Sequence, residues 1–157
     1  CFVDNPIDPA IARLTKVLQR NPSDAELFLQ LGNLYARKKD HALAIESIEK
    51  SLSLNPHSVA ALNQLARSCA QVKRFDDAVE ALQKVLDIQG DNADVYYNLA
   101  CMYSKMRKID DSLLALVRTV DLGFKDCSLL MEDPDLDAVR DTARFREIVQ
   151  TFCSEQK

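Results

Sequence analysis

The feature of this sequence that most limits its fold is a repeat with a period of 34 residues. When the sequence is compared with itself at this offset, Leu31-Gly32 aligns with Leu65-Ala66 and then with Leu99-Ala100. Other columns also keep their chemical type. They are Phe28, Leu62 and Tyr96; Tyr35, Cys69 and Tyr103; Ala44, Ala78 and Ser112; and Ile48, Leu82 and Leu116. A period of this length with small residues at fixed positions predicts a two-helix unit that stacks on its neighbours.

The residues of each column have a physical role in such a unit. Phe28, Leu31 and Tyr35 recur at steps of three and four, which places them on one face of a helix. Gly32 is small at a point where two helices would otherwise collide. Pro56 ends a helix because proline cannot continue the hydrogen-bond ladder. One helical pair cannot cover its own apolar face, so the pairs are expected to stack.

These residues resemble tetratricopeptide repeats, in three units over residues 25–58, 59–92 and 93–124. The first unit matches the family pattern best. The later units depart from it at Ala66, Cys69 and Gly90, and at Ala100, Ser112 and Phe124. The resemblance implies an all-α fold, an α-solenoid that winds as a right-handed superhelix.

Helical patterns flank the three units. Residues 8–22 fit the second-helix columns, with Asp8 predicted as the helix cap and Pro9 as the first helical residue. This half-repeat is either an N-terminal cap or the end of an upstream repeat. Residues 125–157 are predicted to form a helical C-terminal cap on the third unit. Their pattern resembles the segment that closes many bacterial arrays of this family, and we predict a single domain over residues 1–157.

The resemblance implies that the first helix of each pair lines a concave groove. Asn and Gln at groove positions offer donors and acceptors that match the backbone of an extended peptide. Tyr97 and Leu29 would supply apolar pockets, and Arg67 would bind an acidic group. We therefore predict a non-catalytic adaptor or scaffold that binds a protein or peptide partner. The predicted groove residues are Asn33, Asn63, Gln64, Arg67, Tyr97 and Asn98. The alternative is that these are solvated helix positions without a ligand.

One variant of the family holds the C-terminal carboxylate of chaperone tails with lysine, arginine and asparagine side chains. Asn33 stands in a suitable place for such a clamp. The other clamp positions carry different residue types, namely Leu29, Gln64, Asp94 and Asn98. The acid at Asp94 would repel such a tail, so chaperone-tail binding is not expected.

Two charge patterns lie outside the groove. Basic residues cluster at the turn inside each predicted pair, and acids follow them. The basic residues are Arg37, Lys38, Lys39, Lys73, Arg74, Lys105, Arg107 and Lys108. They complement the helix dipoles, or they form an edge for an anionic partner. The C-terminal segment is acidic; its acids either cap short helices or bind a basic partner, and Thr142 is predicted to cap the last helix.

Composition and motifs argue against several classes of function. The net charge of −4, with acids beside the basic clusters, argues against nucleic acid as a partner. No GxSxG, P-loop or HExxH motif is present, so no enzymatic activity is predicted. Five cysteines without a CxxC pair, and two histidines, give no basis for a metal site, and no cofactor is predicted. No apolar run approaches the ~20 residues needed to span a membrane.

The cysteines and the chain ends leave alternatives open. An odd cysteine count without evident pairing favours a reducing compartment, so the predicted location is cytoplasmic. Cys69 and Cys101 are predicted to be free and buried. One alternative is a bacterial envelope-assembly lipoprotein in the periplasm, lipid-anchored through Cys1 with residues 2–7 as a tether. Another is a self-assembling scaffold, a homo-oligomer that forms through the exposed end of the half-repeat.

Overall fold

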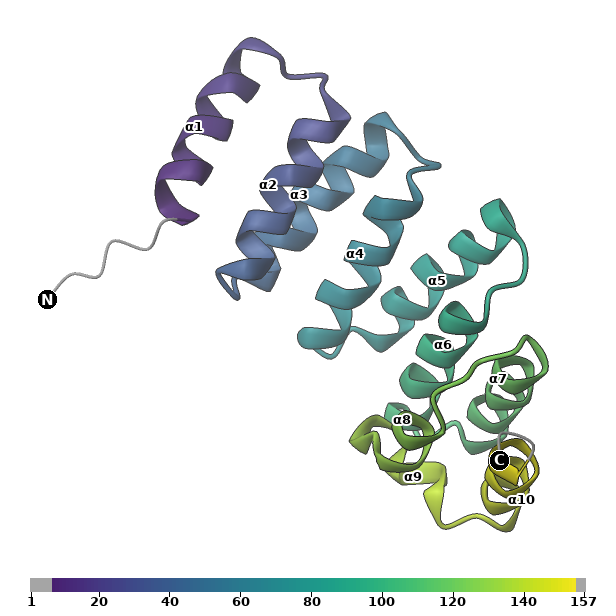
Figure 1. The fold of residues 1–157 in the computed structure, drawn as a ribbon. Helices are drawn as coiled ribbons and strands as arrows, with labels where there is room; N and C mark the ends of the chain where they lie inside the picture. Colours follow the sequence, from purple (N-terminus) through teal and green to yellow (C-terminus); the bar gives the residue numbers. More distant parts are fainter. Residues whose placement is uncertain (1–6, 155–157) are drawn as a thin grey trace, which may run out of the picture. The chain divides into compact units, whose positions relative to one another are not determined.

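The computed structural model describes residues 7–154, and every regular element within them is a helix (Figure 1). The chain divides into two compact units, residues 1–81 and 82–157. The first unit contains α1 (Ile7–Arg20), α2 (Ala25–Arg37), α3 (His41–Leu54) and α4 (Val59–Gln71). Helix α5 (Phe75–Gln89) runs from the first unit into the second. The second unit continues with α6 (Ala93–Lys105), α7 (Ile109–Asp121), α8 (Cys127–Glu132), η1 (Pro134–Leu136), α9 (Asp137–Arg140) and α10 (Ala143–Ser154).

The first helix of each pair begins after a capping side chain, and these caps follow the sequence period. Asp24 and Asn92 each accept hydrogen bonds from two backbone N–H groups of the following turn, and Ser58 accepts one. These bonds satisfy donors that have no partner inside the helix. The predicted cap at Thr142 is also present, because its Oγ1 accepts from the N–H of Phe145 at 3.2 Å.

The turn inside each pair has one backbone conformation in all three repeats. Lys39, Lys73 and Arg107 have φ angles of 66°, 62° and 57°. This left-handed region is uncommon for residues other than glycine. The residue after each of them donates its N–H to a carbonyl near the helix end at 2.9 Å, which closes the turn. The basic clusters therefore lie at the C-terminal ends of the first helices, where positive charge is favourable.

In the first unit, α2, α3 and α4 enclose a core that contains Leu29, Ala44, Ile48 and Ala61. Helices α2 and α3 come very close at Gly32. A Cβ atom on this glycine would lie 2.5 Å from Ile48 Cγ1 and 3.1 Å from the Ala44 carbonyl oxygen. The predicted need for a small residue here is confirmed. The expectation that Leu29 faces the groove was wrong, because its side chain is only 6% exposed and belongs to this core.

Helix α1 packs on α2 and corresponds to the predicted entering helix. It begins at Ile7, so Asp8 lies inside the first turn instead of capping it. The Asp8 carboxylate binds Lys38 Nζ at 2.6 Å, an ion pair that joins α1 to the end of α2. Cys1, on which the lipoprotein hypothesis depends, lies outside the described residues. Between residues 7 and 154, no helix has the length and apolarity that crossing a membrane requires.

In the second unit, the C-terminal segment covers the helix pair α6–α7, as predicted. The short elements η1 and α9 pack on α6, and α10 packs on α7 and α8 (Figure 1). Leu130, Leu136 and Val139 of this segment are fully buried. Burial of this apolar surface stabilises the cap on the third repeat.

The cysteines differ in part from the sequence-based expectation. Cys69 and Cys101 are free and buried, as predicted. Cys127 and Cys153 form a disulfide between α8 and α10. The sequence analysis found no pairing for these two residues, because no local motif marks them. The disulfide joins the first residue of α8 to the last turn of α10, so it links the beginning of the cap to its end.

Replacing Gly32 with alanine is expected to destabilise the first unit. Alanine improves helix propensity by about 1 kcal/mol, but overpacking against Ile48 costs about 1–3 kcal/mol. We expect Gly32→Ala to lower the free energy of unfolding by about 1 kcal/mol, measured by urea titration followed by circular dichroism. In an Ile48→Ala background the same change should cost less, because the collision with the Ile48 side chain is gone and only the close contact with the Ala44 carbonyl oxygen remains. Stabilisation in the native background would contradict this account of the packing.

Candidate functional site

Three of the six predicted groove residues line one pocket in the first unit. Asn33 comes from α2, and Gln64 and Arg67 come from α4. The pocket has a volume of about 380 Å³. Its other lining residues are Ala36, Arg37, His41, Ser68 and Gln71. The lining positions are spaced by three and four residues along each helix, so each helix contributes a single stripe.

The pocket carries positive charge and no acidic side chain lines it. Arg37 and Arg67 are both exposed, and within residues 7–154 neither of them forms a salt bridge. Two other basic residues of the same unit are paired with acids. Lys38 binds Asp8, and Arg74 Nε binds Asp77 Oδ2 at 2.6 Å. The two pocket arginines are therefore available to a ligand.

Two polar atoms in the pocket wall have no hydrogen-bond partner within the described part of the chain. They are Ser68 Oγ and His41 Nδ1. The Ser68 side chain is 1% exposed. A buried polar group without a hydrogen bond costs about 1–3 kcal/mol, so a water molecule or a ligand group that hydrogen-bonds to these atoms would be stabilised here.

The other predicted groove residues are not part of this pocket. Asn63 lies on α4 and is half-buried outside the pocket lining. Asn98 is exposed on α6, in the second unit. Tyr97 is 7% exposed, and its ring stacks on Phe124 with 5.0 Å between the centroids. Its hydroxyl donates a hydrogen bond to the carboxylate of Asp133. Tyr97 thus contacts the C-terminal cap of its own chain.

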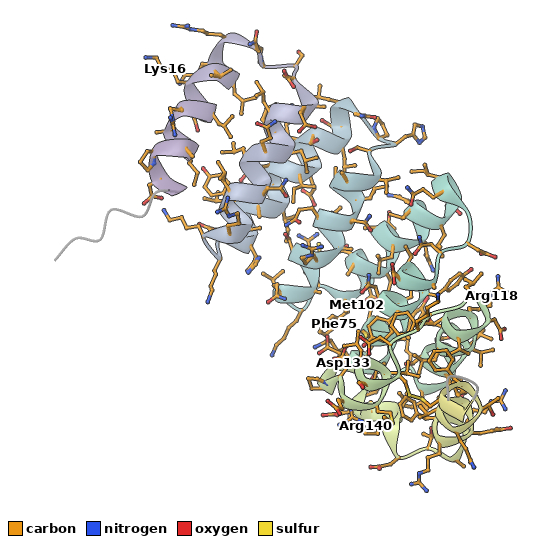
Figure 2. All side chains as sticks on the ribbon, in the orientation of Figure 1. Lys16, Phe75, Met102, Arg118, Asp133 and Arg140 are labelled. Atoms are coloured by element: carbon orange, nitrogen blue, oxygen red, sulfur yellow. A yellow bond between two sulfur atoms is a disulfide. The ribbon has the colours of Figure 1, made fainter. Side chains whose placement is uncertain are left out.

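The cap places an acidic turn, residues 133–135, on one stripe of α6. Besides its bond with Tyr97, Asp133 lies 4.0 Å from the sulfur of Cys101, and Lys105 Nζ binds Asp135 Oδ1 at 2.5 Å. Arg140 donates from Nη2 to the Asp133 carbonyl oxygen at 2.5 Å, which holds the turn in place (Figure 2). The predicted capping role of the acids is also present, since Asp133 accepts from the N–H of Asp135.

Sequence reasoning missed this contact because the cap does not follow the repeat. The signal that could have revealed it is the stripe Tyr97, Cys101 and Lys105, which combines a hydroxyl, a thiol and a cation at steps of four. Such a stripe complements the acids of the turn.

The buried thiols are poor nucleophiles. Burial raises the pKa of the Cys69 thiol to about 11. Burial and the nearby carboxylate of Asp133 raise the pKa of the Cys101 thiol to about 12. Both thiols therefore remain protonated at neutral pH. Among residues 7–154, no group of three or more His, Cys, Asp or Glu side chains is arranged to hold a metal ion.

Comparison with protein-family models identifies the family of this chain. A family model described as anaphase-promoting complex, cyclosome, subunit 3 matches residues 4–85, and a tetratricopeptide repeat model matches residues 81–113. The chain belongs to the tetratricopeptide repeat family. Repeats of this family form protein–protein interaction modules, and that is the class of this protein. No curated protein sequence matched the chain.

Solved structures share the fold. A crystal structure of MamA is 24% identical over 96% of this chain and 88% of that chain, with a TM-score of 0.79. MamA from Desulfovibrio magneticus RS-1 is 20% identical over 100% and 91%, with a TM-score of 0.76. YrrB, described as a TPR protein with an unusual peptide-binding site, is 20% identical over 91% and 83%, with a TM-score of 0.62. This chain therefore has the all-α fold of an α-solenoid.

The bond between Tyr97 and Asp133 is expected to stabilise the cap. Tyr97→Phe removes a buried hydrogen bond to a carboxylate and should lower the free energy of unfolding by about 1.5–3 kcal/mol, measured by thermal and urea unfolding. The matched control is Tyr96→Phe. Tyr96 donates its hydroxyl to Asp91 at an exposed site, at 2.9 Å, so its loss should cost about 0.5 kcal/mol or less. Equal effects of the two variants would contradict the assigned role.

Proposed function

We propose that this protein is a non-catalytic adaptor that binds a segment of a partner protein in the pocket between α2 and α4. The observation that carries the proposal is the convergence of Asn33, Gln64 and Arg67 on this pocket. The two amide side chains offer donors and acceptors to the backbone of an extended peptide. The arginine offers a planar, bidentate contact to a carboxylate or carbonyl group.

The dimensions of the pocket fit this function. A volume of about 380 Å³ lies near the lower end of the range for ligand pockets. It admits one large side chain together with part of its backbone, so the rest of a bound segment would lie along the exposed surface of α2 and α4. Peptide binding is compatible with the fold, since YrrB, which shares it, is described as having a peptide-binding site.

The test compares the native chain with the triple variant Asn33→Ala, Gln64→Ala, Arg67→Ala. Tagged chains capture proteins from the source cell, and the affinity of each captured partner is then measured with purified components. Three lost hydrogen bonds of about 0.5–1.5 kcal/mol each predict a loss of affinity of at least about tenfold.

The matched control removes one arginine and two amide side chains from exposed sites outside the pocket, with Arg13→Ala, Gln19→Ala and Gln89→Ala. It should bind every partner as the native chain does. Equal affinity of all three proteins for every partner would refute the pocket as the binding site.

The disulfide supports the alternative location proposed for this chain, an oxidising compartment such as the periplasm. Structural disulfides persist in oxidising compartments and are rare in the cytosol. Cys127 and Cys153 are paired. Cys69 and Cys101 are buried, and their raised pKa values protect them from oxidation at neutral pH. The cysteine content is thus compatible with secretion.

Thiol trapping in intact source cells tests this location. Free thiols are alkylated before lysis, and the digested protein is analysed by mass spectrometry. We expect a linked peptide that contains Cys127 and Cys153, whereas Cys69 and Cys101 become alkylated only after denaturation and serve as internal controls. Alkylation of Cys127 and Cys153 before denaturation would place the chain in a reducing compartment.

A further inference from the structure

The pocket between α2 and α4 is lined by positive charge without an acidic side chain beside it. Arg37, Arg67 and His41 line it together with amide and hydroxyl groups, and no carboxylate is present among the lining residues. The protein as a whole has a net charge of −4. A pocket that holds two unpaired guanidinium groups is complementary to an anionic group of matching size.

In the second unit, the positions of α6 that are equivalent to the pocket-lining positions of α4 already have a binding partner. Residues at a spacing of 34 occupy equivalent positions in the repeats, so Arg67 corresponds to Cys101 and Gln71 corresponds to Lys105. In α6 this stripe contacts the carboxylates of the acidic turn, residues 133–135. The chain therefore already contains one stripe, on α6, that binds carboxylates through residues equivalent to Arg67 and Gln71.

The pocket of the first unit also presents cations to a carboxylate, although Gln71 stands where α6 has Lys105. Arg67 replaces a thiol, and Arg37 approaches the same pocket from α2. An arginine donates two parallel hydrogen bonds to a carboxylate, whereas a thiol is a weak donor. Ser68, whose Oγ has no hydrogen-bond partner in the described part of the chain, also lines this pocket.

We infer that the pocket between α2 and α4 binds an aspartate or glutamate side chain of an extended partner segment, held by Arg37 and Arg67. This inference rests on the proposed function and specifies its ligand. The bound segment lies across the amide groups of Asn33 and Gln64 while its acidic side chain enters the pocket. The arginines then gain the ion pairs that they lack in the free protein.

The test uses two pools of short synthetic peptides. Every peptide of one pool has a fixed central aspartate, and the other pool has asparagine at that position. Binding to the native protein is measured by fluorescence anisotropy. Charge-assisted hydrogen bonds predict that the aspartate pool binds at least about tenfold more tightly, and that the difference shrinks as salt is added.

Two matched double variants locate the effect. Arg37→Gln with Arg67→Gln should abolish the preference for aspartate. Arg13→Gln with Lys16→Gln removes the same number of positive charges from α1 and should retain it; Lys16 is labelled in Figure 2. All four side chains are exposed, and circular dichroism verifies that both variants remain folded.

The outcomes separate this inference from the proposed function. Equal binding of the two pools, or a preference for aspartate that survives in Arg37→Gln with Arg67→Gln, would overturn the inference. If the triple alanine variant still loses its partner in that case, the adaptor function stands with a ligand of different chemistry. Self-association of the chain through this pocket, seen as a mass that rises with concentration and falls in the arginine variant, would also overturn it.

Discussion

The structure depends on the close contact between the two helices of each pair. At Gly32 the backbone of α2 approaches the side chain of Ile48 on α3 so closely that a single added methyl group would collide with it. This contact fixes the distance between the helices, and α4 then packs on α3 at a fixed place. The pocket between α2 and α4 exists because both helices rest on α3. The small residues Ala66 and Ala100 occupy the same column and are also buried.

The features that could be predicted from the sequence are those that depend on residues close together in the chain. The helix pairs follow from apolar spacing, the contact at Gly32 from the small-residue column, and the cap at Thr142 from a side chain three residues from its partner. The same local patterns recur in each of the three repeats, which makes them easier to recognise. Asn33, Gln64 and Arg67 could be placed near one another because the repeat aligns α2 with α4.

The features that could not be predicted depend on the path of segments outside the repeat. The Cys127–Cys153 disulfide and the contact of Asp133 with α6 require knowing how the cap folds back. Tyr97 was expected to face a ligand, and in the structure it binds this cap. The burial of Leu29 has another cause: a leucine at the margin of a helix face satisfies the pattern for groove and core equally, and only packing decides between them.

The acidic turn has a consequence for the valency of the protein. Because residues 133–135 belong to the same chain, and the disulfide closes the loop that carries them, they remain beside α6 at an effective concentration of roughly millimolar order. That concentration does not change when the protein is diluted. An external acidic segment of the same intrinsic affinity, at micromolar concentration, would not displace such a tethered competitor. Under the proposed function, acidic segments would therefore bind to the repeats that have no internal ligand.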